Sequence, residues 1–268
     1  MTDRSCPSST NPKSNVCSPF LALLSLFLGA CTSAGPAIME RAANPTAQAE
    51  QIVVVRTPGW DAPTGTLVWY ERNRLGDPWI RVGEPCEINV GRSGLAWGRG
   101  LHGGALGEGP EKREGDGRSP AGVFRLSAIY GHVPRNNMRF LRMPYIEATS
   151  TCQCVDDVHS AYYNLVLDSL SVADADWNSR ERLGPDAGSW NAWGVIVDHN
   201  VNPREPGRGS CIFLHVSEGR GVPTSGCTSI GEERIAALVR WLDAGKHPVL
   251  VQLPDLQHQQ LNSRWRLP

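Results

Sequence analysis

The segment GSCIFLHVSEGRGVPTSGCTSIGEE, residues 209–233, carries the clearest signals for the fold. Its first part, 210–216, is rich in β-branched and aromatic residues, which predicts a strand that brings His215 to its end. Glycines and Pro223 then predict a turn. Ser229 and Glu232 form the Ser-x-x-Glu pattern of a helix capping box. The segment therefore predicts a strand, a short loop and a helix that begins just after Cys227.

The expected helix has an apolar stripe. Ile235, Leu238, Val239 and Leu242 recur at i, i+3, i+4 and i+7, a spacing that places them on one face for packing against a sheet. Gly245 follows as the expected C-terminal stop. This is the one clear helix in the sequence.

Short runs rich in β-branched and aromatic residues fill most of the remaining chain. We expect strands at 51–55, 66–71, 86–90, 122–130, 163–168, 194–198, 210–216 and 248–253. The glycine-rich stretch 100–120 is too polar for a core and is expected to be a surface loop. The pattern predicts a mostly β protein with one domain over 51–253 and a C-terminal tail over 254–268.

The charge balance argues against a nucleic-acid-binding protein. The 268 residues contain 26 Lys+Arg and 27 Asp+Glu, a net charge of −1. Such a chain lacks the basic surface that attracts a phosphate backbone. We expect no nucleic-acid partner.

The N-terminal region has the features of an export signal. The uncharged run FLALLSLFLGA at 20–30 is too short to span a bilayer but suits the apolar part of a signal peptide. We expect a signal peptide over 1–30, followed by a flexible tether over 31–50 that is rich in Ala, Ser, Thr, Pro and Gln. Leu28-Gly29-Ala30-Cys31 resembles the lipobox of bacterial lipoproteins. A plain secretory signal with a chance cysteine is the alternative.

Cys227 and His215 form a candidate catalytic pair. A thiol close to a helix N-terminus is favoured as thiolate, and an imidazole can take its proton and later protonate a leaving amine. Gly226 allows close backbone approach, and the amides around 226–228 could form an oxyanion hole. A buried structural thiol with a hydrogen-bonded histidine is the alternative interpretation.

Several dispersed blocks resemble the L,D-transpeptidase catalytic domain (YkuD-like) family. The His-strand and Ser-Gly-Cys turn of 209–233 are similar to its active-site signature. EGDGRSPAGVFRL at 114–126, CVDDVHSAYYN at 154–164, GVIVD at 194–198 and WGRGLH at 97–102 resemble its other blocks. Together they cover about 50–253, and the fold implied is a β-sandwich-like mixed sheet.

The resemblance implies an enzyme in which Cys227 is the nucleophile and His215 the general base and acid. Gly226, Ser225 and Thr228 would shape the oxyanion and substrate site. The family attacks the third residue of a peptidoglycan stem peptide, usually diaminopimelate, releases the terminal D-alanine and passes the acyl group from a thioester to an amine. A hydrolase of the same fold and a non-catalytic wall-binding lipoprotein are the alternatives. No cofactor or metal is implied, and we expect a monomer.

The sequence departs from the family pattern at two positions. Ser225 stands where many members have His, and Ser229 where many have Arg. The acyl acceptor is therefore left open.

The lipobox resemblance implies a place in the cell. Cys31 would carry the lipid, and the protein would be exported to the periplasmic side of an envelope membrane. Thr32 rather than Asp after Cys31 favours the outer membrane.

Other polar residues near these blocks have open roles. Asp198 or His199 could orient His215, although a backbone carbonyl could do the same. Arg99 and His102 could contact substrate or hold a turn. The segment Asp116-Gly117-Arg118 is expected to be a structural turn, and most of the nine tryptophans are expected to pack rather than stack on glycan.

The eight cysteines separate by position. Cys6 and Cys17 leave with the signal, Cys31 is the lipid site and Cys227 must stay free. Among the remaining Cys86, Cys152, Cys154 and Cys211, we expect a disulfide from Cys154 or Cys152 to Cys211.

Overall fold

The computed structural model describes residues 44–188 and 192–268. The expected signal peptide, the lipid site at Cys31 and one of the nine tryptophans, Trp190, lie outside the described residues. No helix in the described part of the chain is long and apolar enough to cross a membrane.

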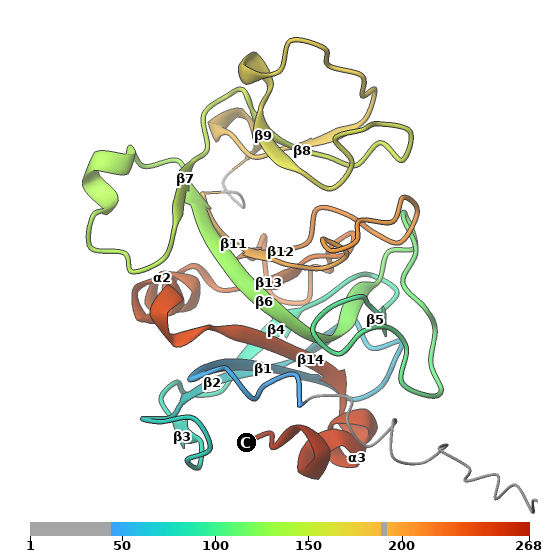
Figure 1. The fold of residues 1–268 in the computed structure, drawn as a ribbon, viewed down its shortest axis with the longest axis vertical. Coiled ribbons are helices and arrows are strands. Elements are labelled where there is room, and N and C mark those ends of the chain that lie inside the picture. Colours follow the sequence, from blue (N-terminus) through green and yellow to red (C-terminus); the bar gives the residue numbers. More distant parts are fainter. Residues whose placement is uncertain (1–43, 189–191) are drawn as a thin grey trace, which may run out of the picture. The chain divides into compact units, whose positions relative to one another are not determined.

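A mixed sheet closes on itself to form the body of the protein (Figure 1). Its strands run in the order β1-β14-β6-β11-β12-β13-β4-β2-β3, and β1 also pairs with β2, so the sheet is barrel-like. β5 and β7 pair with β6 at its two ends. The strands are β1 Gln51–Thr57, β2 Thr64–Glu71, β3 Ile80–Arg81, β4 Cys86–Asn89, β5 Leu95–Trp97, β6 Ser119–Gly131, β7 Tyr145–Glu147, β11 Trp193–Val197, β12 Phe213–Val216, β13 Thr228–Ile230 and β14 Val249–Pro254.

A second, three-stranded sheet, the cap sheet, consists of β8 (Cys152–Val155), β9 (Val166–Asp168) and β10 (Arg180–Arg182), with β8 in the centre. A disulfide between Cys154 in β8 and Cys211 ties it to the segment before β12. This confirms one of the two expected pairings. Cys86, Cys152 and Cys227 are free thiols.

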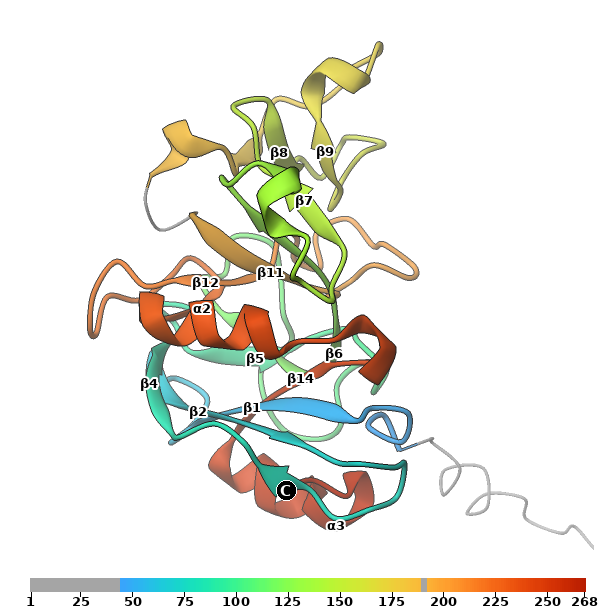
Figure 2. The ribbon, with the colours of Figure 1, turned by 90° about the vertical axis from the view of Figure 1, so that its left-hand side faces the viewer.

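Within residues 44–188 and 192–268, two α-helices pack against the main sheet. α2 (Glu232–Trp241) lies against β11 and β12, and α3 (Asp255–Trp265) lies against β1 and β14 (Figure 2). Ile235, Leu238, Val239 and Leu242 are all at most 1% exposed, so the expected apolar stripe is confirmed. Short 3-10 helices occur at Arg135–Met138, Ser169–Ser171, Pro185–Ala187 and Ala244–Lys246.

All eight expected strands are present, and the mostly β mixed-sheet fold is confirmed. The expected capping box is wrong. Ser229 lies in β13, which pairs with β12 and β4, and α2 begins at Glu232 after Gly231 without a side-chain cap. The pairing of 228–230 with two strands outweighs the local preference of Ser229 for a cap.

The expected helix stop is also misplaced. α2 ends at Trp241, and Leu242 has extended backbone (φ −57°, ψ 138°). Gly245 lies in the next 3-10 helix, where its N–H donates to the Asp243 carboxylate at 2.9 Å. α2 therefore ends without a glycine stop, just before the buried Leu242.

Both ends of the described chain pack onto the body. Residues 44–50, which the sequence placed in the flexible tether, form turns in which Thr46 and Ala49 are buried. The Thr46 hydroxyl donates to the carbonyl oxygen of Trp265 at 2.6 Å. Residues 255–265, for which the sequence predicted no element, form α3, and Trp265 is 2% exposed. The packed region therefore extends beyond 51–253 on both sides.

Candidate active site

Cys227 and His215 lie on the same face of the main sheet. β12 and β13 run parallel, with Leu214 opposite Thr228 and His215 opposite Ser229. Neighbours across a ladder share a face, and side chains alternate along each strand. Cys227 lies two residues before Ser229, so Cys227, Ser229 and His215 face the same side of the sheet. Leu214 and Thr228 face the core.

The imidazole of His215 is oriented by the backbone. Its Nδ1 lies 2.8 Å from the carbonyl oxygen of Val216. A carbonyl can only accept, so Nδ1 carries the proton and Nε2 is the basic nitrogen of the neutral ring. The side chain is 6% exposed. The sequence left open whether Asp198, His199 or a backbone carbonyl orients His215. In the structure, the carbonyl of Val216 does so.

The thiol of Cys227 is held between two backbone groups. Its Sγ donates to the carbonyl oxygen of Cys211 at 3.4 Å and accepts from the N–H of Phe213 at 3.3 Å. The residue is 8% exposed. Burial, together with the charge of Glu181, raises the pKa of the Cys227 thiol well above its usual range.

This pKa shift contradicts the expected stabilisation of a thiolate. The sequence placed Cys227 directly before a helix, but β13 separates it from the first residue of α2, Glu232. The helix dipole acts only over about one turn. Cys227 is therefore a thiol at neutral pH.

The backbone of Cys227 is fixed from both sides. Its carbonyl oxygen accepts from the hydroxyl of Ser119 at 2.7 Å and from that of Thr224 at 2.6 Å. The Ser119 hydroxyl also accepts from the N–H of Gly91 at 2.8 Å. Ser119 begins β6, in the EGDGRSPAGVFRL block, so this block holds the backbone of Cys227, which is 108 residues away in sequence.

The loop between His215 and Cys227 is organised by one amide. The Asn89 side chain donates to the hydroxyl of Ser217 at 2.9 Å and to the carbonyl oxygen of Gly219 at 3.1 Å, and accepts from the N–H of Gly221 at 3.0 Å. It also lies 3.3 Å from the Ser229 hydroxyl. Asn89 was not a candidate in the sequence because no motif of neighbouring residues distinguishes it.

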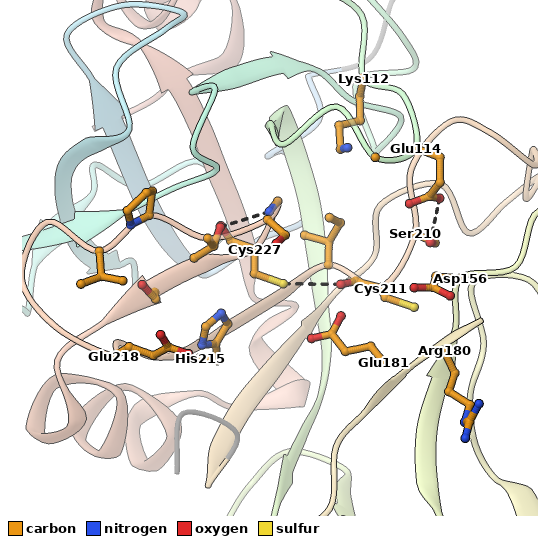
Figure 3. Close-up of a pocket in the computed structure, with 18 residues that line it drawn as sticks. Lys112, Glu114, Asp156, Arg180, Glu181, Ser210, Cys211, His215, Glu218 and Cys227 are labelled. Carbon is orange, nitrogen blue, oxygen red and sulfur yellow. Dashed lines mark hydrogen bonds between the residues drawn. The ribbon is translucent and has the colours of Figure 1, made fainter. Parts of the chain in front are cut away.

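Cys227 and His215 line one cavity of about 570 Å³ (Figure 3). Ser225 and Gly226 line it as well, as expected. Thr228 does not: its hydroxyl donates to Oε1 of Gln252 at 2.7 Å, on the core side of the sheet. The N–H of Gly226 donates to the Thr224 hydroxyl at 3.1 Å, and a Cβ at this glycine would lie 3.2 Å from the Arg118 carbonyl oxygen.

The cap sheet supplies a wall of this cavity that the sequence did not predict. Glu181 of β10 and Asp156, directly after β8, line it together with Arg180. Burial and the charge of Asp156 raise the pKa of Glu181 to about 8. Asp156 lies in the CVDDVHSAYYN block, but no pattern in the sequence distinguishes Glu181.

On the opposite wall, the charged groups are paired. The Lys112 ammonium lies 2.6 Å from the Asp116 carboxylate, and Glu114 accepts from the hydroxyls of Tyr163 and Ser210. Lys112 is buried although the sequence places it in a surface loop. The Asp116 carboxylate also accepts from the N–H of Arg118 at 2.9 Å, so the expected structural turn is confirmed.

The remaining candidates, His199, His102, Asp198 and Arg99, do not line the cavity that contains Cys227 and His215. His199 is 1% exposed; its Nδ1 accepts from the Arg99 N–H and its Nε2 donates to the Arg208 carbonyl oxygen, and burial lowers its pKa to about 3. Burial likewise lowers the pKa of His102 to about 4. Asp198 accepts from Ser127 at 2.6 Å, and Arg99 pairs with Glu205.

Tryptophans do not line this cavity among the described residues. Trp69 lies 6.3 Å from Trp241, and Trp60 lies 5.3 Å from Trp97, measured between ring centroids. Both pairs belong to or pack against the core. Within the described ranges, we find no group of three or more His, Cys, Asp or Glu side chains that could hold a metal ion.

A thiol directly before β13 and an oriented imidazole in the neighbouring strand β12 are the pair of groups that a cysteine enzyme of the acyl-enzyme class requires. The family model of the L,D-transpeptidase catalytic domain, YkuD, matches residues 51–251. The chain belongs to this family. Neither a search of curated proteins nor a search of solved structures found a match.

Proposed function

We propose that this protein is an L,D-transpeptidase that forms a thioester with a peptidoglycan stem peptide at Cys227 and transfers the acyl group to an amine. The observation that carries this proposal is that His215 of β12 and Cys227, directly before the neighbouring strand β13, line one cavity. Membership of the YkuD family supports the substrate class.

In the first step, Nε2 of His215 takes the proton of Sγ while Sγ attacks the carbonyl carbon of the third stem residue. Proton transfer accompanies attack because the Cys227 thiol has a raised pKa. The C–N bond to the terminal D-alanine then breaks, and His215 returns the proton to the leaving amine. In the second step an amine attacks the thioester, and its N–H proton returns to sulfur through His215.

Incubation of the purified protein with tetrapeptide muropeptides tests the proposal by mass spectrometry. Cross-linked or amine-exchanged products and a thioester on Cys227 are expected. Tripeptide alone would indicate a hydrolase, and binding without turnover a wall-binding protein. Cys227→Ala should abolish turnover, because no other free thiol of the described chain lines the cavity. Cys86→Ser, which changes a free thiol outside the cavity, is the matched control.

We also propose that the chain is an exported lipoprotein anchored through Cys31 on the periplasmic side of the outer membrane. The apolar run at 20–30 and the Leu-Gly-Ala-Cys sequence support this. A nearly neutral enzyme would then be held near the wall by its anchor rather than by charge. Metabolic labelling with a fatty-acid analogue should mark the wild-type protein and leave Cys31→Ala unlabelled.

A further inference from the structure

Glu181 is directed at the catalytic thiol by the cap sheet. In the pairing of β10 with β8, Glu181 lies opposite Cys154, so both side chains share one face. Cys154 is bonded to Cys211, whose carbonyl oxygen accepts from Sγ of Cys227. The face that carries Glu181 therefore points toward the nucleophile. In the view of Figure 3, Sγ projects between the His215 ring and the Glu181 carboxyl.

The carboxyl groups on this wall lack a cation. Among the described residues, the Glu181 carboxyl makes no hydrogen bond or ion pair, and Oδ1 of Asp156 is buried without a hydrogen-bond partner. Lys112 is already paired with Asp116, and Figure 3 shows the Arg180 guanidinium turned away from Glu181. Both side chains are half-buried, and an unpaired carboxyl group that is partly withdrawn from water is stabilised by a cation, so this wall is suited to a positively charged ligand group.

We propose that Glu181 is a catalytic residue of the transfer step: it binds the protonated primary amine of the acyl acceptor beside the Cys227 thioester and takes up the proton that this amine must lose before it attacks. This inference rests on the proposed transpeptidase function, because it assigns the acceptor side of the same cavity.

The proton balance of the transfer step requires such a group. An acceptor arrives as R–NH₃⁺, since a primary amine has a pKa of about 10, and it leaves as an amide with one N–H. One proton passes to the Glu181 carboxylate, which frees the nitrogen lone pair. The nitrogen attacks the thioester carbon, the C–S bond breaks, and the second proton reaches sulfur through His215. The carboxylic acid of Glu181 then releases its proton to solvent before the next cycle.

The surroundings of Glu181 suit this role. The ionisable groups that interact with Glu181 are Asp156 from the end of β8, Cys227 before β13 and Tyr130 of β6, while Arg180 and Arg182 flank it on β10. Lys112, Glu114, His215 of β12 and Glu218 line the same cavity, and Lys112 is paired with Asp116. The charge that acts on Glu181 is the negative one of Asp156, so this part of the cavity favours a cation. Because its pKa is about 8, the Glu181 carboxylate is a stronger base than an ordinary one and lies closer to the amine in proton affinity.

The test separates the two half-reactions in Glu181→Gln, which keeps shape but cannot take a proton. With purified full-length protein, the rate of thioester formation from a tetrapeptide muropeptide should stay within about twofold, because removal of the Glu181 charge does not hinder the thiolate. Transfer to glycine amide or to a tripeptide muropeptide should fall by roughly 100-fold. The wild-type transfer rate should rise through pH 8, and this limb should be absent from the variant.

Asp174→Asn is the matched control, since Asp174 is an exposed carboxylate between β9 and β10 that does not line the cavity. It should transfer at the wild-type rate. Equal loss of both half-reactions in Glu181→Gln, or no loss of transfer, would overturn the inference. A loss of acylation only with donors that carry a side-chain amine would assign the wall to the donor instead. Failure of the wild-type protein to form a thioester would refute the proposed function itself. This outcome distinguishes failure of the proposed function from failure of the inference about Glu181.

Discussion

At the scale of single residues, the reactivity of Cys227 depends on its enclosure. Sγ is held by the Phe213 N–H and the Cys211 carbonyl oxygen, and burial keeps the thiol protonated. The N–H of Phe213 and the charge of Lys112 lower the pKa of this thiol, but less than burial raises it. In the proposed mechanism, the thiolate would form only when a substrate is present and His215 takes the proton.

The protonated state of the Cys227 thiol predicts how its alkylation rate depends on pH. A raised thiol pKa lowers the thiolate fraction at pH 7, and only the thiolate reacts. We expect iodoacetamide to modify Cys227 in the folded protein at least about tenfold more slowly at pH 7 than in urea. The rate should still be rising between pH 9 and 10. Mass spectrometry of the peptide that contains Cys227 measures both rates.

A rate that reaches its plateau below pH 8 would contradict this account, because it would indicate a preformed thiolate. Cys227 alkylation in His215→Gln is the control. It should show the same rise with pH, because burial rather than the imidazole is the main cause of the shift.

The sequence located the two central residues but not their electrostatics. The Cys227 and His215 positions follow from a motif that is local along the chain. The direction of the pKa shift depends on which element follows Cys227, and on Glu181, which approaches from 46 positions earlier in the chain. Ser119 and Asn89 were missed for the same reason, since their contacts join segments 108 and 128 residues apart.

At the scale of elements, the pattern of apolar residues predicted the long buried strands but not the short ones. β10 reads Arg-Glu-Arg and β13 has three residues, too few for an alternating pattern to be recognised. Yet β13 sets the face of Cys227, and β10 carries Glu181. The cap sheet is tied to the segment before β12 by the Cys154–Cys211 disulfide, one of the two pairings that the sequence left open.

Removal of this disulfide should destabilise the protein and loosen the cavity wall. Cys154 and Cys211 are 57 residues apart in sequence, and a loop of that length corresponds to about 4 kcal/mol of unfolded-state entropy. We expect Cys154→Ser/Cys211→Ser to lose free energy of unfolding of that order in urea titrations. Amine transfer should decrease more than thioester formation, because Glu181 lies opposite Cys154.

The double variant leaves no unpaired partner that could exchange with Cys152, which is buried in the same cluster. Cys86→Ser should change the free energy of unfolding by less than about 1 kcal/mol. If the double variant unfolded at the same urea concentration as the wild type, the disulfide would have no role in holding the cap sheet.

At the scale of the whole molecule, the ends of the described chain complete the sheet body. The sequence ended the domain at residue 253 because Asp255–Trp265 has little apolar periodicity. Trp265 nevertheless packs into the core, with its ring 5.9 Å from that of His102, and its carbonyl oxygen holds Thr46. His102 in turn fills the space beside Gly122 of β6. The C-terminal helix is thus linked to the loop before β6 and to the start of the packed chain.

Trp265→Ala should therefore destabilise the entire body rather than release a tail. Truncation of a fully buried tryptophan costs about 3–5 kcal/mol, and we expect the midpoint of urea unfolding to fall accordingly while a single transition is kept. Leu256→Ala on the same helix is the control, since Leu256 is 58% exposed, and it should change the free energy of unfolding by less than about 0.5 kcal/mol. An equally small loss in Trp265→Ala, or a separate early transition, would mean that α3 folds independently of the sheet. If Trp265→Ala loses the expected free energy of unfolding and still unfolds in one transition, residues 44–50 and 255–265 belong to the same cooperative unit as Cys227 and His215.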